Sequence, residues 1–116
     1  MIIKIYHGVE IKEEANPTIR HCKIHDGKRN GVLVCQKGQG IVEDCDIFAN
    51  IYYGVEIREE GNPIIQKCRI NRNGYEAIWS DSNGRGTVEN YDLTGNKRGA
   101  FDIDSTSQVQ QSNNKT

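Results

Sequence analysis

Two pairs of adjacent acidic residues, Glu13-Glu14 and Glu59-Glu60, are the first groups in the chain that could do chemistry. Two carboxyl groups placed on either side of a sugar can supply the acid and the base, or the acid and the nucleophile, of glycoside hydrolysis. The second pair, however, repeats the first 46 residues later, and a catalytic pair is needed only once. Repetition favours a scaffold role, so the sequence predicts no catalytic residue and does not favour an enzyme.

A single tryptophan beside carboxylates is a second candidate. Residues spaced by 23 should form a row on the outer face of one sheet, and an exposed tryptophan there could stack on a sugar or dock a protein. The alternative, which we favour, is a solvated sheet face with one aromatic residue. The candidate binding residues are Glu10, Leu33, Glu56, Trp79 and Asp102 in the row, with Arg58 and Asp81 beside it.

Three of the four cysteines, Cys22, Cys45 and Cys68, share the same spacing, and Tyr91 continues it. A zinc site needs converging ligands, whereas a column of repeated positions points its side chains the same way, and no CxxC or HxxxH spacing is present. One disulfide is conceivable but would leave one thiol of the column over. We expect buried free thiols, no metal and no cofactor, and hence a reducing, intracellular compartment, cytoplasmic or nuclear. Cys35 should face outward, alone.

All these positions belong to one repeat of 23 residues that covers nearly the whole chain. Gly- or Ala-led apolar segments begin at positions 8, 31, 54, 77 and 100. Two further apolar series keep the same spacing, and such a repeat is the signature of a solenoid whose neighbouring coils complete each other's core. The two series are Ile19, Val42, Ile65 and Val88, and Ile24, Ile47, Ile70 and Leu93.

Within one coil the pattern predicts three short strands. Val32 and Val34 alternate with Leu33 and Cys35, which is the period of a strand with one buried face, and a glycine turn follows. The chain must then bend between Val42 and the cysteine position to start a third face. No apolar spacing of 3.6 residues persists before residue 104, so we expect an all-β solenoid of about 4.5 coils with parallel strands about 4.8 Å apart.

The charges support this register. At one repeat position the sign alternates along the sequence in the order Lys23, Asp46, Arg69 and Asp92. Opposite charges on adjacent strands contribute only tenths of a kcal/mol each when exposed, but they oppose slippage of the register.

Composition excludes several classes of function. The chain has 116 residues, a formal charge of -1 and an apolar fraction of 35%. Because no basic stripe and no long apolar segment is present, the sequence predicts neither nucleic-acid binding nor membrane association.

The segments 16–27 and 31–50 resemble right-handed parallel β-helix repeats of the pectin-lyase-like type. More narrowly, they resemble the β-helix regions of the F-box only protein 11 group and of the SHC SH2-domain-binding protein group. The resemblance implies a right-handed, single-stranded β-helix, and in the F-box relatives such repeats present a surface to substrates of a ubiquitin ligase. It carries over no catalytic residue, because the matching positions are structural.

We therefore expect a β-helix domain over residues 1–104 and a polar, disordered tail over residues 105–116. The expected function is non-catalytic protein binding, with carbohydrate binding or a carbohydrate-active fragment as the alternative. Because solenoid ends expose core residues unless they are capped, end-to-end self-association is a further expectation.

Overall fold

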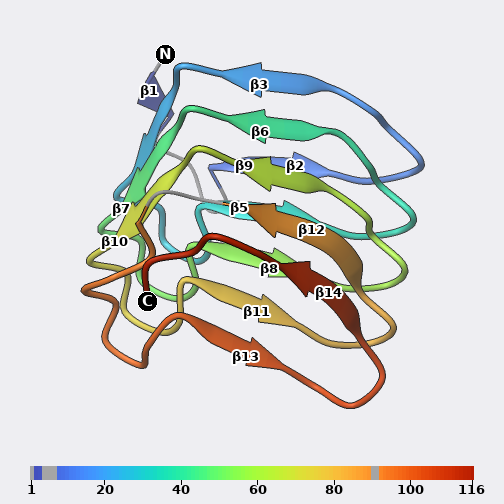
Figure 1. Cartoon of the computed structure of the whole chain (residues 1–116). Helices are drawn as coiled ribbons and strands as arrows, with labels where there is room; N and C mark the ends of the chain where they lie inside the picture. Colours follow the sequence, from blue (N-terminus) through green and yellow to red (C-terminus); the bar gives the residue numbers. More distant parts are fainter. Residues whose placement is uncertain (1, 4–7, 90–91) are drawn as a thin grey trace.

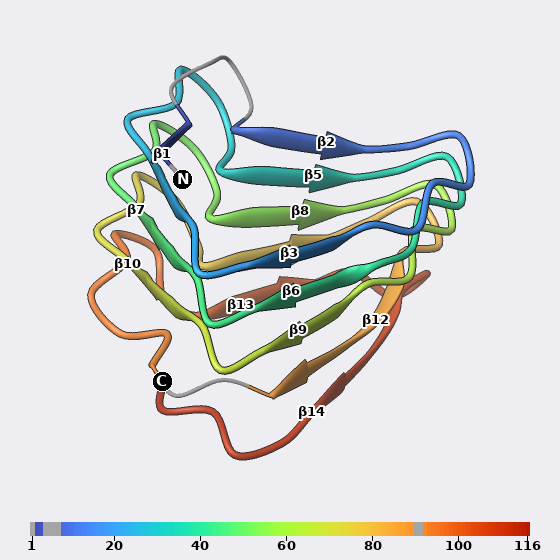
Figure 2. The ribbon, with the colours of Figure 1, turned by 90° about the horizontal axis from the view of Figure 1, so that it is seen from above.

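The computed structural model describes residues 2–3, 8–89 and 92–116, and it shows a parallel β-solenoid with three faces (Figures 1 and 2). Sheet A consists of β1 (Ile2–Ile3), β4 (Lys23–His25), β7 (Asp46–Phe48) and β10 (Arg69–Asn71). Sheet B consists of β2 (Val9–Ile11), β5 (Val32–Val34), β8 (Val55–Ile57), β11 (Ile78–Ser80) and β13 (Phe101–Ile103). Sheet C consists of β3 (Thr18–Arg20), β6 (Ile41–Glu43), β9 (Ile64–Gln66), β12 (Arg85–Glu89) and β14 (Gln108–Gln111). The prediction of three strands per coil is confirmed.

Every strand pairs in parallel with its own copy 23 residues away. In sheet B, for example, Val32 lies opposite Val9 on one side and Val55 on the other. The inward columns are fully buried, as Ile47, Ile65 and their repeats show. The core is thus a stack of identical positions, in which each apolar side chain is covered by its equivalents one coil before and one coil after.

The turns from sheet B to sheet C explain the paired carboxylates. Glu59 and Glu60 have φ values of 52° and 60°, and the turn closes through a 2.9 Å hydrogen bond from the Gly61 N–H to the Arg58 carbonyl. Two successive left-handed residues inside such a bond correspond to the φ values of a type I′ turn. Glu13 and Glu14 occupy the same two positions in the first coil. The pairs are therefore turn residues, each repeated by the solenoid.

A buried column of asparagines holds the opposite corner, between sheets A and B. Asn50, Asn73 and Asn96 are each no more than 9% exposed. Each of the first two donates from its backbone N–H and its side chain to the Oδ1 of the next. The column also bonds to main-chain carbonyls of the preceding coil, such as Ile47 O at 3.3 Å from Asn73 Nδ2. These bonds fix the loops that follow sheet A.

The expected disorder of residues 105–116 is not what the structure shows. β14 pairs with β12 over four residues, so Gln111 lies opposite Val88 at a position that other coils fill with Val or Ile. Further on, Asn114 donates to the Val88 carbonyl at 3.0 Å, and the Leu93 N–H donates to the Lys115 carbonyl at 2.8 Å. The backbone lattice continues here while apolar side chains stop, which is why hydrophobic periodicity gave no sign of it. A coil with polar residues at inward positions is suited to meet water at a solenoid end.

Candidate functional site

The outer face of sheet B is more covered than the sequence indicated. Glu10 and Asp102 are exposed and Trp79 is partly exposed, but Leu33 and Glu56 are only 4% and 5% exposed. Cys35, expected to face outward alone, is 4% exposed. The physical reason is that outward side chains of adjacent coils pack on one another, and the loop between sheets A and B folds over them. The row is therefore not a uniformly solvated face.

Glu56 is held at the middle of this face. Asn30 Nδ2 donates to its Oε1 at 2.6 Å, and the guanidinium of Arg58 donates to its Oε2 at 3.2 Å. Burial raises the pKa of Glu56, although the charge of Arg58 and the bond from Asn30 work in the opposite direction. Burial likewise raises the pKa of Asp81, which lies within electrostatic reach of Glu56. The carboxylate thus serves as an anchor for its neighbours.

Four aromatic residues gather beside Glu56. The rings of Tyr53 and Trp79 stack with 4.5 Å between centroids, and Tyr52 stacks on Tyr75 at 4.9 Å. Tyr53 also meets Tyr75 edge to face at 5.2 Å. Burial, followed by the nearby charge of Glu76, raises the pKa of Tyr53 to about 12. Offset and edge contacts of this kind each contribute about 0.5–1.5 kcal/mol beyond area burial.

These groups surround a cavity of about 310 Å³. Of the residues predicted for the outer face, the structure brings Glu56, Arg58 and Trp79 together at this cavity, whereas Glu10, Leu33, Asp81 and Asp102 do not line it. The sequence analysis did not identify the other lining residues. These are Arg29, Asn30, Tyr52, Tyr53 and Tyr75. One signal could have found them: Tyr52, Tyr53 and Tyr75 are aromatic at loop positions where other coils carry Arg, Asn, Glu or Gly.

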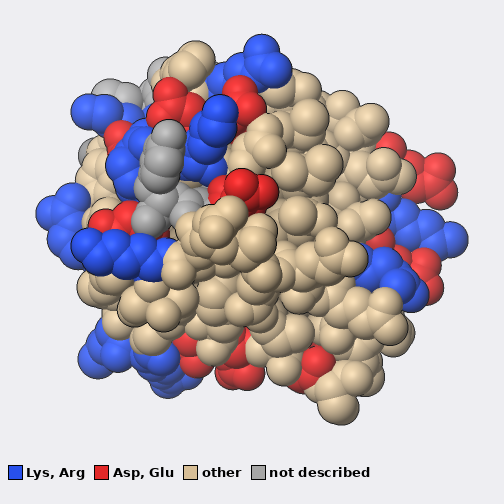
Figure 3. Space-filling model, in the orientation of Figure 1, with Lys and Arg blue, Asp and Glu red and all other residues tan. Residues whose placement is uncertain are grey.

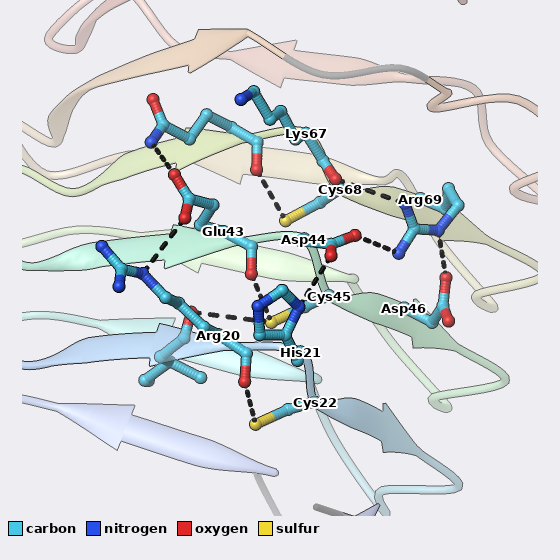
Figure 4. Close-up of polar contacts among 12 residues, drawn as sticks. Arg20, His21, Cys22, Glu43, Asp44, Cys45, Asp46, Lys67, Cys68 and Arg69 are labelled. Atoms are coloured by element: carbon cyan, nitrogen blue, oxygen red, sulfur yellow. Dashed lines mark hydrogen bonds and ion pairs between the residues drawn. The ribbon is translucent and has the colours of Figure 1, made fainter.

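The cysteine column lies inside the solenoid, as Figure 4 shows. Cys22, Cys45 and Cys68 are free and buried, and each thiol donates to a main-chain carbonyl two residues before it. Contact with Cys45 and burial raise the pKa of Cys68, so this thiol stays protonated at neutral pH. Tyr91, predicted to continue the column, lies outside the described residues. Over the part of the chain that the structure describes, no group of three or more His, Cys, Asp and Glu side chains could hold a metal ion.

The charged side chains outside this column are paired between coils (Figure 4). Arg20 contacts Glu43 at 3.1 Å, and Arg69 bridges Asp46 and Asp44, the latter at 2.9 Å. Hydrogen bonds from Arg69 and His21 lower the pKa of Asp44. The predicted alternation therefore becomes real ion pairs, and their role is to hold the register.

The two strands of argument meet in the comparisons with known proteins. A family model described as the right-handed β-helix region matches residues 2–116. No curated protein and no solved structure matches the chain, so nothing found supports the narrower resemblance to F-box or SHC-binding proteins. No helix long and apolar enough to cross a membrane occurs in the described residues. With its three parallel sheets and 23-residue coils, the chain belongs to the right-handed β-helix region family.

Proposed function

We propose that the chain is a non-catalytic β-helix module that binds another protein through the corner between sheets A and B. We define this A–B corner as residues 26–31, 49–54, 72–77 and 95–100. The observation that carries the proposal is the exposure of large apolar side chains there: Ile51 is 55% exposed and Tyr52 is 38% exposed. They adjoin Tyr75, whose ring is covered by the guanidinium of Arg98 at 3.7 Å.

The composition of the A–B corner supports this proposal. Tyrosine, tryptophan and arginine are the residues most enriched among those that dominate binding energy in protein interfaces. Large aromatic side chains also lose little conformational entropy on binding, particularly when neighbouring rings already hold them. A role in substrate recognition within a ubiquitin ligase, and an intracellular location, are finer versions of the same proposal. They rest on the resemblance of the repeats alone.

A variant pair tests the proposal. Tyr52→Ser should reduce capture of a specific partner from cell extract at least about tenfold, because one central anchor of an interface contributes about 2 kcal/mol or more. Ile64→Ser is the matched control, since Ile64 is an equally exposed apolar residue, at 41%, on sheet C. Equal capture by the wild-type chain and the Tyr52 variant would contradict the proposal. So would an equal loss of capture in both variants.

Carbohydrate binding is the second candidate, and the cavity beside Trp79 favours it. Aromatic rings and hydrogen-bonding groups line the same space, with Asn30, Glu56 and Arg58 beneath the rings. Titration of a glycan array against the wild-type chain and Trp79→Ala tests this reading. Saturable binding that the variant loses would support it. No binding at millimolar concentrations would remove it.

The solenoid ends offer a separate route to self-association. If coils of two copies stack end to end, the solution mass should rise with concentration, as sedimentation equilibrium would show. A constant monomer mass would contradict that route and leave the A–B corner proposal unaffected.

A further inference from the structure

Two columns of side chains run along the A–B corner parallel to the solenoid axis. Each coil contributes one residue to each column, because the positions are 23 residues apart. The first column contains Arg29, Tyr52, Tyr75 and Arg98. The second contains Lys28, Ile51, Gly74 and Lys97. Both columns therefore have uncharged residues in the two middle coils and a basic residue at each end.

The first column is held in place by its own backbone. The Tyr52 N–H donates to the Arg29 carbonyl at 2.9 Å, and the Tyr75 N–H donates to the Tyr52 carbonyl at 2.9 Å. The Arg98 N–H continues the series to the Tyr75 carbonyl at 3.3 Å. With the asparagine column directly beneath, the corner is already ordered, so a ligand would pay little to arrange it.

The charge of this corner has the opposite sign to that of its counterpart across the molecule. The A–B corner carries five basic residues and two acidic ones, Asp26 and Glu76. The basic residues are Lys28, Arg29, Arg72, Lys97 and Arg98, all exposed. The connections from sheet B to sheet C, residues 12–17, 35–40, 58–63, 81–84 and 104–107, carry six acidic and three basic residues. Figure 3 shows basic side chains along the left edge, beside β7, β10 and the loops that follow them.

We infer that the A–B corner binds a short acidic segment of a partner protein, laid along the solenoid axis. An apolar or aromatic residue of the segment packs on Tyr52 and Ile51, and an acidic residue on each side of it reaches the basic pair at that end. This inference rests on the proposed function, because it names the chemistry of the partner that the same corner would take.

The spacing of the coils sets the length of the segment. The two basic ends are three coils apart, which is about 14 Å at about 4.8 Å per coil. An extended chain covers that distance in about four residues. The segment should therefore carry acidic residues on both sides of a central apolar residue, within about five positions.

Charge also separates this partner from a nucleic acid. A nucleic acid needs a continuous basic track, because every nucleotide brings a phosphate. Here the basic corner ends at sheet B, whose adjoining outer face presents Glu10 and Asp102 to solvent. A short acidic peptide fits the corner without crossing that face.

Fluorescence polarisation with a labelled peptide tests the inference. The probe is Glu-Asp-Gly-Phe-Gly-Asp-Glu, and the comparison probes are the same peptide with Gly in place of Phe and a single-stranded oligonucleotide. The acidic probe should bind saturably, more weakly as salt rises. Arg29→Glu and Arg98→Glu should each weaken it about tenfold or more, and the Phe-to-Gly probe should also bind more weakly. Arg85→Glu, an exposed charge reversal on β12, should leave binding within about twofold.

Three results would overturn the inference: no saturable binding of the acidic probe, an equal effect of Arg85→Glu, or tighter binding of the oligonucleotide. Far-ultraviolet circular dichroism of each variant separates lost binding from lost folding. If the probe fails while Tyr52→Ser still abolishes partner capture, the proposed function stands and the acidic partner is wrong. If Tyr52→Ser has no effect on capture, the proposed function itself falls.

Discussion

Asn73 donates two hydrogen bonds to one oxygen of Asn96, from its backbone N–H at 3.1 Å and from its Nδ2 at 2.8 Å. The same side chain accepts two bonds from Asn50 through its own Oδ1. One buried amide thus joins three successive coils. It also holds the loop that carries Tyr75 and Glu76, so the order of the A–B corner depends on it.

Replacing Asn73 by Ala should lower the free energy of unfolding by about 2–4 kcal/mol, because buried donors and acceptors on both neighbouring coils lose their partner. Urea unfolding followed by circular dichroism measures the change. Asn62→Ala is the matched control, since Asn62 is exposed, and it should change stability by no more than about 0.5 kcal/mol. Similar losses in the two variants would contradict the structural role of the asparagine column.

All four thiols should resist alkylation in the folded chain. Cys22, Cys35, Cys45 and Cys68 are each no more than 7% exposed, and burial raises the pKa of Cys35 while contact with Cys45 and burial raise that of Cys68. Because the thiolate is the reactive form, both exposure and ionisation act against labelling. Mass spectrometry after brief iodoacetamide treatment should show the unlabelled chain, and four labels after unfolding in urea. Rapid labelling of Cys35 in the folded chain would show that its outward position is open after all.

Glu56 should make the chain less stable as the pH rises. Its pKa in the folded chain lies above the ordinary value of 4.5 because of burial. Over the range from about 4.5 up to the raised pKa, the folded chain keeps a proton that the unfolded chain has released. The free energy of unfolding therefore falls as the pH rises through that range.

Glu56→Gln removes this dependence while it keeps an oxygen that can accept from Asn30 or Arg58. The stability of the variant relative to the wild type should increase between about pH 4 and about pH 7, as urea midpoints at each pH would report. Glu13→Gln, in an exposed turn, controls for the loss of one negative charge. A difference between Glu56→Gln and wild type that stays constant with pH would rule out the effect.

The C-terminal strand should be visible in hydrogen exchange. The Gln108 N–H donates to the Gly84 carbonyl at 2.9 Å, and the Ser112 N–H donates to the Val88 carbonyl at 3.2 Å. These amides should exchange at least about tenfold more slowly than in an isolated peptide, although faster than those of β8, because an end coil opens more easily than a central one. Exchange at the rate of an unstructured peptide would restore the expectation of a disordered tail.

The sequence by itself determined the repeat, the three strands per coil and the register. It could do so because an inward column repeats one residue type at a fixed spacing, as Ile24, Ile47 and Ile70 do, and because burial of alternate residues identifies a strand. It also placed Glu59 and Glu60 at a turn. These features depend on backbone spacing and on which side of a strand a residue faces.

Only the tertiary structure decided what covers an outward position. Alternation shows that Leu33 and Glu56 face away from the core, but the path of the next loop decides whether they meet water, and Tyr53 with Trp79 shields this face. The same limit applies to Gln111. Its place opposite Val88 follows from backbone hydrogen bonds, which leave no trace in hydrophobicity once the inward side chains become polar.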